Sequence, residues 1–156
     1  MLLISIKIKE VFEEMRKIPN GVFIDRPDDL VMGDIAVSKE IKEITRSTSS
    51  SAHFKRRSLK HLAEKGDEGE RLLNMIPSIL GCPEEIRQGR LEGRFLISKS
   101  FKIIGAGRPH NVIIEVAEKY GNIIVTSFQT DTEYLSNYKL LWRTGVPKGT
   151  VPPSRP

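Results

Sequence analysis

Val112–Thr130, which reads VIIEVAEKYGNIIVTSFQT, decides the fold of this chain. It holds two runs of β-branched residues, Val112–Val116 and Ile123–Val125, joined through Tyr120-Gly121-Asn122. Side chains of this kind fit a pleated, half-buried surface, and a Gly-Asn pair supplies the positive φ that a tight turn needs. The stretch therefore predicts the central antiparallel hairpin of a sheet, with the preceding helices packed on one face.

Helical spacing of apolar residues predicts four helices before the hairpin. They are Val11–Ile18, a short helix capped by Ser38, the basic stretch His53–Lys65, and a helix from Asp67 to Leu80. Pro77 is expected to kink the last of these helices or to open a second helical segment. Ahead of the first helix, LLISIKI at residues 2–8 alternates like a strand, and GVFI at residues 21–24 is interpreted as a short strand.

The period of the sequence changes at Arg94. Arg94–Ser98 and Phe101–Ile104 predict two strands, or one longer strand with a bulge. Asp131 or Thr132 is expected to cap a last helix. Its amphipathic spacing is carried by Tyr134, Leu135, Tyr138, Leu141 and Trp142. Helices, then an antiparallel meander, then a short C-terminal helix predict an α+β domain, with helices on one face of a three- to four-stranded antiparallel sheet.

Three parts of the chain are distinguished by composition. Residues 1–37 are interpreted as an N-terminal accessory segment, and residues 38–143 as the α+β domain. Residues 144–156 are rich in proline and form a tail that can neither continue a helix nor join a central strand. TRSTSSS, at residues 45–51, is interpreted as a linker or lid, or as the polar first turn of the next helix.

Composition limits the class of protein. The chain has 156 residues, enough for one domain with a real core, and it lacks the roughly 18-residue apolar run of a membrane helix. No signal peptide is recognisable, and the single Cys82 excludes an intramolecular disulfide, so we expect a cytoplasmic protein. The net charge of +5 and the pI near 9.4 favour a polyanion as partner.

Neither a metal nor a cofactor is expected. The three histidines, His53, His61 and His110, are too scattered for a ligand set defined by spacing. The GAGR loop at residues 105–108 lacks the following helix with Lys-Ser or Lys-Thr that a phosphate-cradling turn requires, and it is interpreted as a hairpin loop.

Three side chains are candidates for chemistry. His61 lies in the basic helix and could act as a general acid or base, because histidine titrates near neutrality. Arg94 opens an otherwise apolar strand and could stabilise charge that develops on a phosphate. Thr126 could donate its hydroxyl to a phosphate oxygen, provided that it points to the sheet face opposite the helices. The ordinary alternatives are a solvated histidine, an edge-strand arginine and a plain strand threonine.

Four further residues are predicted to contact RNA. Arg56, Arg57 and Lys60 surround His61 in sequence and would supply positive potential for a phosphodiester. Ser127 follows Thr126, and by strand alternation only one of the two can face the helices. If Ser127 rather than Thr126 takes the open face, the strand is scaffold only.

The order of these features resembles the barnase–EndoU–colicin–RelE superfamily of metal-independent ribonucleases, and in particular its phage- and toxin-associated branches. The resemblance covers about residues 50–142. It rests on Leu59-Lys60-His61-Leu62, Met75–Leu80 with the following Cys82–Ile86, Arg94, and Ile123–Phe128.

The resemblance implies a domain that cleaves RNA without a metal by attack of the 2′-hydroxyl on the phosphodiester. Within it, His61 would act in acid–base catalysis, Arg94 would contact the phosphate, and Thr126 would lie near the scissile bond. An antitoxin or immunity-type protein is implied as a partner. No carboxylate base matches, and His53 and His110 are candidates for a second histidine by residue type alone. The alternative function is a nucleic-acid-binding or protein-interaction module of the same fold without catalysis.

Overall fold

The computed structural model describes residues 3–101, 108–117, 119 and 121–145. Its helices are α1 (Ile6–Arg16), α2 (Lys39–Thr45), α3 (Arg56–Ala63), α4 (Asp67–Gly81) and α5 (Thr132–Leu135). Its strands are β1 (Leu30–Ala36), β2 (Ser51–Lys55), β3 (Glu85–Gln88), β4 (Arg94–Ser100), β5 (Pro109–Ala117), β6 (Gly121–Gln129) and β7 (Leu140–Arg143).

The strands form one mixed sheet of seven strands in the order β1-β2-β6-β5-β4-β3-β7. All neighbouring pairs are antiparallel except β2 and β6, which run parallel. The prediction of an α+β fold is therefore confirmed, whereas the prediction of a three- to four-stranded, purely antiparallel sheet is wrong. The additional strands are β1, β2, β3 and β7, and two of them are only four residues long.

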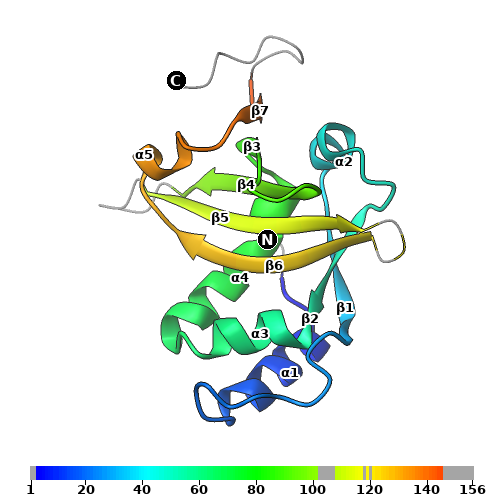
Figure 1. Ribbon diagram of the computed structural model, residues 1–156, viewed down its shortest axis with the longest axis vertical. Coiled ribbons are helices and arrows are strands. Elements are labelled where there is room, and N and C mark those ends of the chain that lie inside the picture. Colours follow the sequence, from blue (N-terminus) through cyan, green and yellow to red (C-terminus); the bar gives the residue numbers. More distant parts are fainter. Residues whose placement is uncertain (1–2, 102–107, 118, 120, 146–156) are drawn as a thin grey trace.

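The predicted hairpin is formed by β5 and β6, near the middle of the sheet (Figure 1). In its register Ile113 pairs with Thr126 but Ile114 pairs with Ile124, so Val125 is the extra residue of a bulge in β6. Gly121 begins β6 with a φ of +75°, the left-handed conformation that the sequence predicted for this turn.

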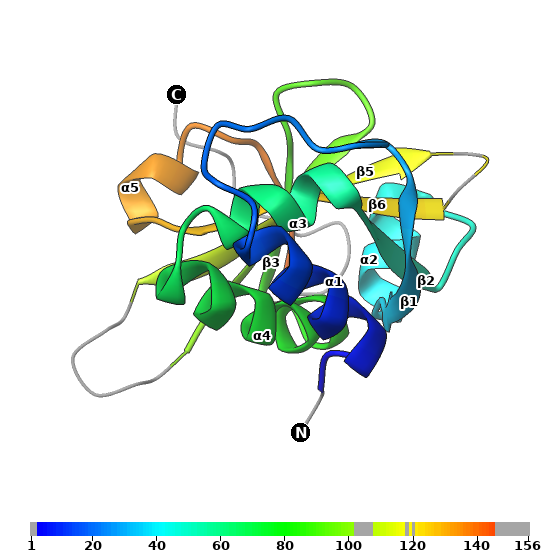
Figure 2. The same cartoon turned by 90° about the horizontal axis from the view of Figure 1, so that it is seen from below.

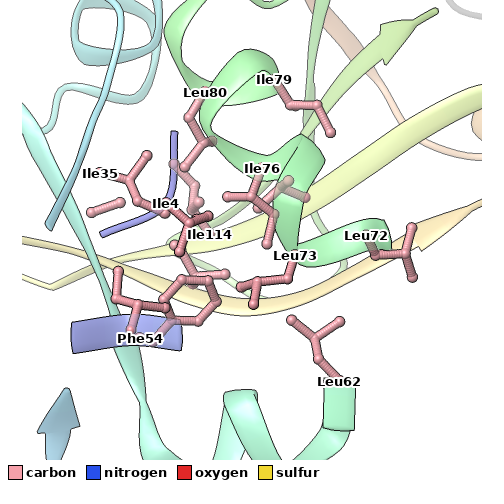
Figure 3. Packing of buried hydrophobic residues seen from close by; sticks show 14 of the residues in the cluster. Ile4, Ile35, Phe54, Leu62, Leu72, Leu73, Ile76, Ile79, Leu80 and Ile114 are labelled. Carbon is pink, nitrogen blue, oxygen red and sulfur yellow. The ribbon is translucent and has the colours of Figure 1, made fainter. Parts of the chain in front are cut away.

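Helices α1, α3 and α4 form a layer on one face of the sheet, where they pack against one another (Figures 1 and 2). The apolar stripe of α4 supplies the middle of the core. Its side chains meet Phe54 of β2 and Ile114 of β5, and all of these are fully buried (Figure 3). Pro77 lies inside α4, which continues through it to Gly81.

The N-terminal segment shares this core. Ile8, Phe12 and Met15 of α1 are fully buried in the same cluster as the α4 side chains, and β1 is a strand of the sheet. LLISIKI is not a strand, because Ser5 caps a helix there: its Oγ accepts a hydrogen bond from the Ile8 backbone N–H at 3.3 Å. The predicted short strand at residues 21–24 is also absent, since these residues form part of the loop between α1 and β1.

Of residues 45–51, Thr45 ends α2, Ser51 begins β2, and residues 46–50 form the loop between them. Ser47 and Ser49 accept hydrogen bonds from backbone N–H groups two residues further on, which gives the serine-rich stretch its own bonding pattern. Asn122 of β6 is fully buried and donates to the carbonyl oxygens of Ser49 and Ser51. The loop is thereby attached to the start of β6.

Helix α3 lies along an edge of β6 that no strand pairs. The pairing of β2 with β6 extends only from Ala52 to Phe54, after which the chain leaves the sheet and enters α3. Ser58 Oγ then donates to the carbonyl oxygen of Ile124 at 2.7 Å, and Lys65 Nζ donates to that of Ser127 at 3.0 Å. The predicted helix His53–Lys65 is thus divided, with its first three residues in a strand.

The C-terminal part differs from its prediction. Asp131 caps α5, accepting a hydrogen bond from the Tyr134 N–H at 2.8 Å, but the helix ends at Leu135. The chain then forms β7, which pairs with β3. The predicted strand over residues 101–104 and the tail beyond residue 145 lie largely outside the described residues.

Removing the Ser58 hydroxyl tests the attachment of α3 to β6. In Ser58→Ala the buried Ile124 carbonyl loses its hydrogen-bond donor, so we expect the free energy of unfolding to fall by about 1–3 kcal/mol. Urea denaturation followed by circular dichroism measures this change. The matched control is Ser136→Ala, because the Ser136 hydroxyl also donates to a carbonyl oxygen but in an exposed position. Equal losses in both variants would contradict the anchoring role.

Candidate functional site

The two faces of the sheet carry different side chains. Val112 and Ile114 point into the core under the helices, so Ile113 and Glu115 point to the opposite face. Part of that face is covered by α5, whose Leu135 packs against Ile113 and Leu96. Figure 1 shows no described helix in front of the remainder, where β5 and β6 cross the molecule. We call this remainder the open sheet face, defined by His53, Arg94, Glu115 and Thr126.

A row of polar side chains crosses the open sheet face. Arg94 pairs with Glu115, Glu115 with Ile123, and Ile123 with His53 of β2. Arg94 Nη2 lies 3.8 Å from Glu115 Oε2, and the two side chains are 34% and 42% exposed. An exposed ion pair of this kind contributes only about 0–1 kcal/mol to stability, so it explains little of the fold.

Thr126 lies in the neighbouring row on the same face. It pairs with Ile113, which in turn pairs with Leu96, two residues from Arg94 on β4. The sheet therefore brings Arg94 and Thr126 to one surface, with strand β5 and Glu115 between them.

His61 lies on the helix that borders this surface. It is three residues beyond Ser58, which binds β6 from α3, and four before Lys65, which binds β6 from the turn after α3. Three helical residues span about 4.5 Å, which is the rise of between one and two strand residues beyond Ile124. His61 is accordingly level with the strand between Val125 and Thr126. The buried side of α3 faces the helix layer, whereas the His61 side chain is 63% exposed.

Glu64 is the nearest charged neighbour of His61. Its Oε1 lies 3.9 Å from His61 Nδ1, and its Oε2 accepts hydrogen bonds from the Gly21 N–H at 2.7 Å and from Lys60 Nζ at 3.0 Å. The Gly21 N–H and then Lys60 hold the pKa of Glu64 below its usual value. Glu64 is thus a fixed anion beside His61.

The predicted RNA-binding residues of α3 have different environments. Lys60 is buried, and its Nζ also donates to the carbonyl oxygens of Ile18 and Pro19, so it holds the loop after α1. Arg57 is exposed and lies 3.0 Å from an Asp28 carboxylate oxygen. Arg56 is half-buried, and its Nε has no hydrogen-bond partner among the described residues. Of the three, Arg57 is the most exposed, and its guanidinium is paired with Asp28.

Ser127 points away from the open sheet face. It pairs with Val112, a core residue under the helices, and it is 0% exposed. Its hydroxyl has no hydrogen-bond partner among the described residues. Contact between the Ser127 side chain and RNA is therefore excluded by its position, and the prediction fails because Ser127, not Thr126, is the member of the pair that faces the core.

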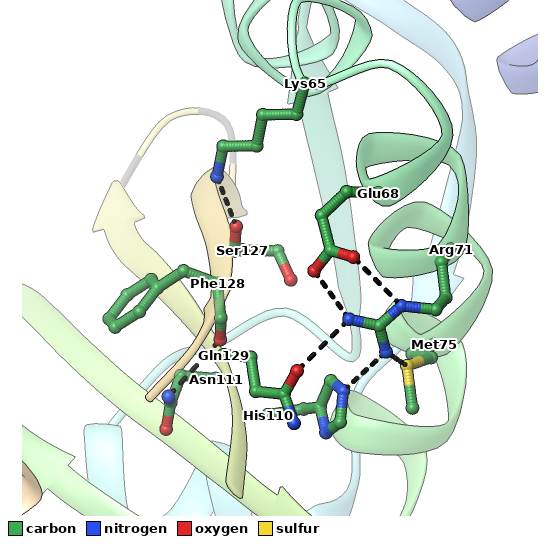
Figure 4. Close-up of polar contacts among 9 residues, drawn as sticks. All are labelled: Lys65, Glu68, Arg71, Met75, His110, Asn111, Ser127, Phe128 and Gln129. Atoms are coloured by element: carbon green, nitrogen blue, oxygen red, sulfur yellow. Dashed lines mark hydrogen bonds and ion pairs between the residues drawn. The ribbon is translucent and has the colours of Figure 1, made fainter. Parts of the chain in front are cut away.

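His110 belongs to a separate network under the helices (Figure 4). Arg71 of α4 pairs with Glu68, donates to Gln129 Oε1 at 3.2 Å, and approaches His110 Nε2 at 2.8 Å. A guanidinium can only donate, so Nε2 must be the unprotonated nitrogen of His110. Burial and then the charge of Arg71 hold the pKa of His110 below its usual value. This network fastens α4 to the ends of β5 and β6 and leaves His110 out of the open sheet face.

Sequence reasoning missed two residues of the site, Glu115 and Glu64. Glu115 lies in the row with Arg94, and Glu64 lies beside His61. Glu115 could have been found, because strand alternation places it on the face opposite Ile114. His53 was named by residue type alone, and its place in the row with Arg94 could not be predicted because helical periodicity included it in a helix. No group of three or more His, Cys, Asp or Glu residues able to hold a metal is present in the described ranges.

No described helix is long and apolar enough to cross a membrane. Comparison with protein-family models, with curated proteins and with solved structures found no match to this chain. A function for the protein must therefore be argued from the geometry and chemistry of its own residues.

The His110 network has a consequence for stability against pH. Because the pKa of His110 is lower in the folded state than in the unfolded state, the unfolded chain binds more protons near pH 6. The free energy of unfolding is expected to decrease as the pH falls from about 7.5 to about 5.5, through the unfolded pKa of about 6.5, by at most about 1.4 kcal/mol per pH unit.

Urea denaturation at several pH values measures this slope. His110→Gln removes the titration but keeps a carbonyl oxygen that can accept from Arg71, so its slope should be smaller than that of the wild type. His53 and His61 remain in both proteins and serve as the internal control. An unchanged slope in His110→Gln would show that another group is responsible.

Proposed function

We propose that the protein is a metal-independent endoribonuclease that cleaves RNA across the open sheet face and the adjoining side of α3. One observation carries the proposal: the strand register puts Arg94 and Thr126 on one sheet face, and hydrogen bonds from Ser58 and Lys65 hold α3, with its exposed His61, along β6. These are the residue types that a phosphodiester cleavage without a metal requires.

The chemistry begins with the RNA itself. A base removes the proton of a 2′-hydroxyl, and the resulting oxygen attacks the adjacent phosphorus. The bond from phosphorus to the 5′-oxygen breaks, and an acid protonates that oxygen as it leaves. The products are a 2′,3′-cyclic phosphate and a free 5′-hydroxyl, so the reaction consumes no cofactor and no oxidant.

Each step has a candidate residue on this surface. His61 serves in proton transfer, and Glu64 Oε1 lies 3.9 Å from its Nδ1. Glu115 is the carboxylate candidate for the second proton-transfer group. Arg94 and the hydroxyl of Thr126 stabilise the extra charge on the phosphoryl oxygens in the transition state. Arg57 adds positive charge on the α3 side of the surface, where the RNA strand would pass.

A nuclease of this kind, acting in the cytoplasm, must be kept from the RNA of its own cell. We therefore expect a protein inhibitor of the antitoxin or immunity type that covers the open sheet face. Acidic residues of such an inhibitor could replace Asp28 and Glu115 as the partners of Arg57 and the half-buried Arg94.

The second candidate is an RNA-binding module without catalysis. It is favoured by the position of Glu115, whose carboxylate is paired with Arg94 at 3.8 Å and is therefore not a free proton-transfer group. This alternative expects salt-sensitive RNA binding that weakens on charge removal at Arg56 and Arg57 and is nearly unchanged in His61→Ala.

Cleavage of total RNA in EDTA distinguishes the two functions. We expect the purified protein to cleave RNA without added metal and to leave 2′,3′-cyclic phosphate ends. The variants His61→Ala, Glu115→Gln, Arg94→Lys and Thr126→Val are each expected to lose on the order of 10²-fold or more in rate. Gel analysis of the products and phosphatase treatment of their ends measure both results.

Lys9→Ala is the charge-matched control, since Lys9 is an exposed cation on α1, in the helix layer. Its rate should equal that of the wild type. Absence of cleavage at high protein concentration, with RNA binding retained, would assign the protein to the second function.

A further inference from the structure

A pocket of about 290 Å³ lies beside His61, between α3 and the loop that connects α1 to β1. Its apolar wall comes from the loop and consists of Val22, Phe23, Ile24 and Pro27. Its polar side comes from α3 and includes Arg57, His61 and Glu64. The pocket is thus built by two segments separated in sequence by residues 28–56, one of which belongs to the N-terminal part of the chain.

Hydrogen bonds as well as packing hold the loop between α1 and β1 against α3. The Gly21 N–H donates to Glu64 Oε2, and Lys60 Nζ donates to the carbonyl oxygens of Ile18 and Pro19. These hydrogen bonds fix the apolar wall at a set distance from α3. Phe23 is nevertheless 99% exposed, although a free phenyl ring in water is unfavourable.

The size and lining of the pocket select its occupant. Its volume is near the lower end for small-molecule sites, about 300 Å³, so it holds one ring system and not a folded segment of another protein. A planar ring can stack on Phe23 and on the guanidinium of Arg57. The hydrogen bonds that Glu64 accepts from Gly21 and Lys60 both end on Oε2, so Oε1 can accept from an N–H donor on the edge of that ring.

We propose that this pocket binds an unpaired nucleobase of the RNA strand, and that the protein therefore acts on single-stranded and not on duplex RNA. The inference rests on the proposed function. A base held between Phe23 and Arg57 leaves its sugar and phosphate at the mouth of the pocket, beside His61. The strand can then continue toward Thr126 and Arg94. A base engaged in a duplex is stacked on both sides and cannot enter.

A double-mutant cycle between protein and ligand tests the pocket. The probes are a short 2′-O-methyl RNA, which cannot be cleaved, and the same strand with a single abasic site, moved along the strand in a series. Fluorescence anisotropy gives Kd for the wild type and for Phe23→Ala. We expect Phe23→Ala and the most sensitive abasic position each to weaken binding roughly tenfold, since stacking of one base contributes that order of affinity.

The two losses should not add, because both changes remove the same contact. A duplex of the same sequence should bind at least tenfold more weakly than the single strand, and Phe23→Ala should not change its Kd. Ile6→Ala is the control: Ile6 is 77% exposed on α1, and its removal should leave binding of the single strand unchanged.

The outcomes test the base-binding pocket separately from the proposed nuclease activity. If the wild type binds the single strand but Phe23→Ala binds it equally well, or if the two losses add fully, the pocket does not hold a base, while the nuclease proposal stands on its own cleavage assay. If the wild type binds neither RNA, the proposed function fails and the pocket inference is overturned with it.

Discussion

The fold depends on how the unpaired edge of β6 is satisfied. In the middle of a sheet every backbone carbonyl needs a donor, and β2 provides partners only as far as Ile124. From Ile124 onward two donors are side chains: the Ser58 hydroxyl of α3 donates to Ile124, and the Lys65 ammonium, in the turn after α3, donates to Ser127. Because each donor binds one defined carbonyl, sliding of α3 along the strand or rotation about its own axis would break these hydrogen bonds.

Because a helix and not a strand lies beside this part of β6, the adjoining surface carries helix side chains. A neighbouring strand would have presented alternate side chains to each face, whereas a helix presents a continuous charged side with Arg57, His61 and Glu64. The open sheet face contributes Arg94, Glu115 and Thr126 on a rigid ladder. Charged side chains of α3 therefore lie beside polar side chains that the sheet holds in fixed positions. Functional sites are more precise when their residues lie on such rigid elements.

The sequence predicted the local structure well and the long-range pairing poorly. The hairpin, the caps at Ser38 and Asp131 and the apolar stripe of α4 each follow from a pattern within one segment. The parallel pairing of β2 with β6 joins residues about 70 positions apart, so it cannot be predicted from a pattern within one segment. His53 was assigned to a helix because apolar spacing continues from the strand into α3. Likewise, alternation showed that Thr126 and Ser127 face opposite ways, but only the register with Val112 shows which one is buried.

The parallel pairing of β2 with β6 also affects the order in which the sheet can form during translation. The elements from α1 to α4 are synthesised before β6, so the edge of β2 that pairs with β6 has no partner strand until β6 has been made. His61 and Thr126 are brought to the same level only when α3 docks on that last central strand. A nascent chain that ends before residue 129 thus carries the α3 side of the surface without the β6 side, and the two sides meet only after β6 has been made.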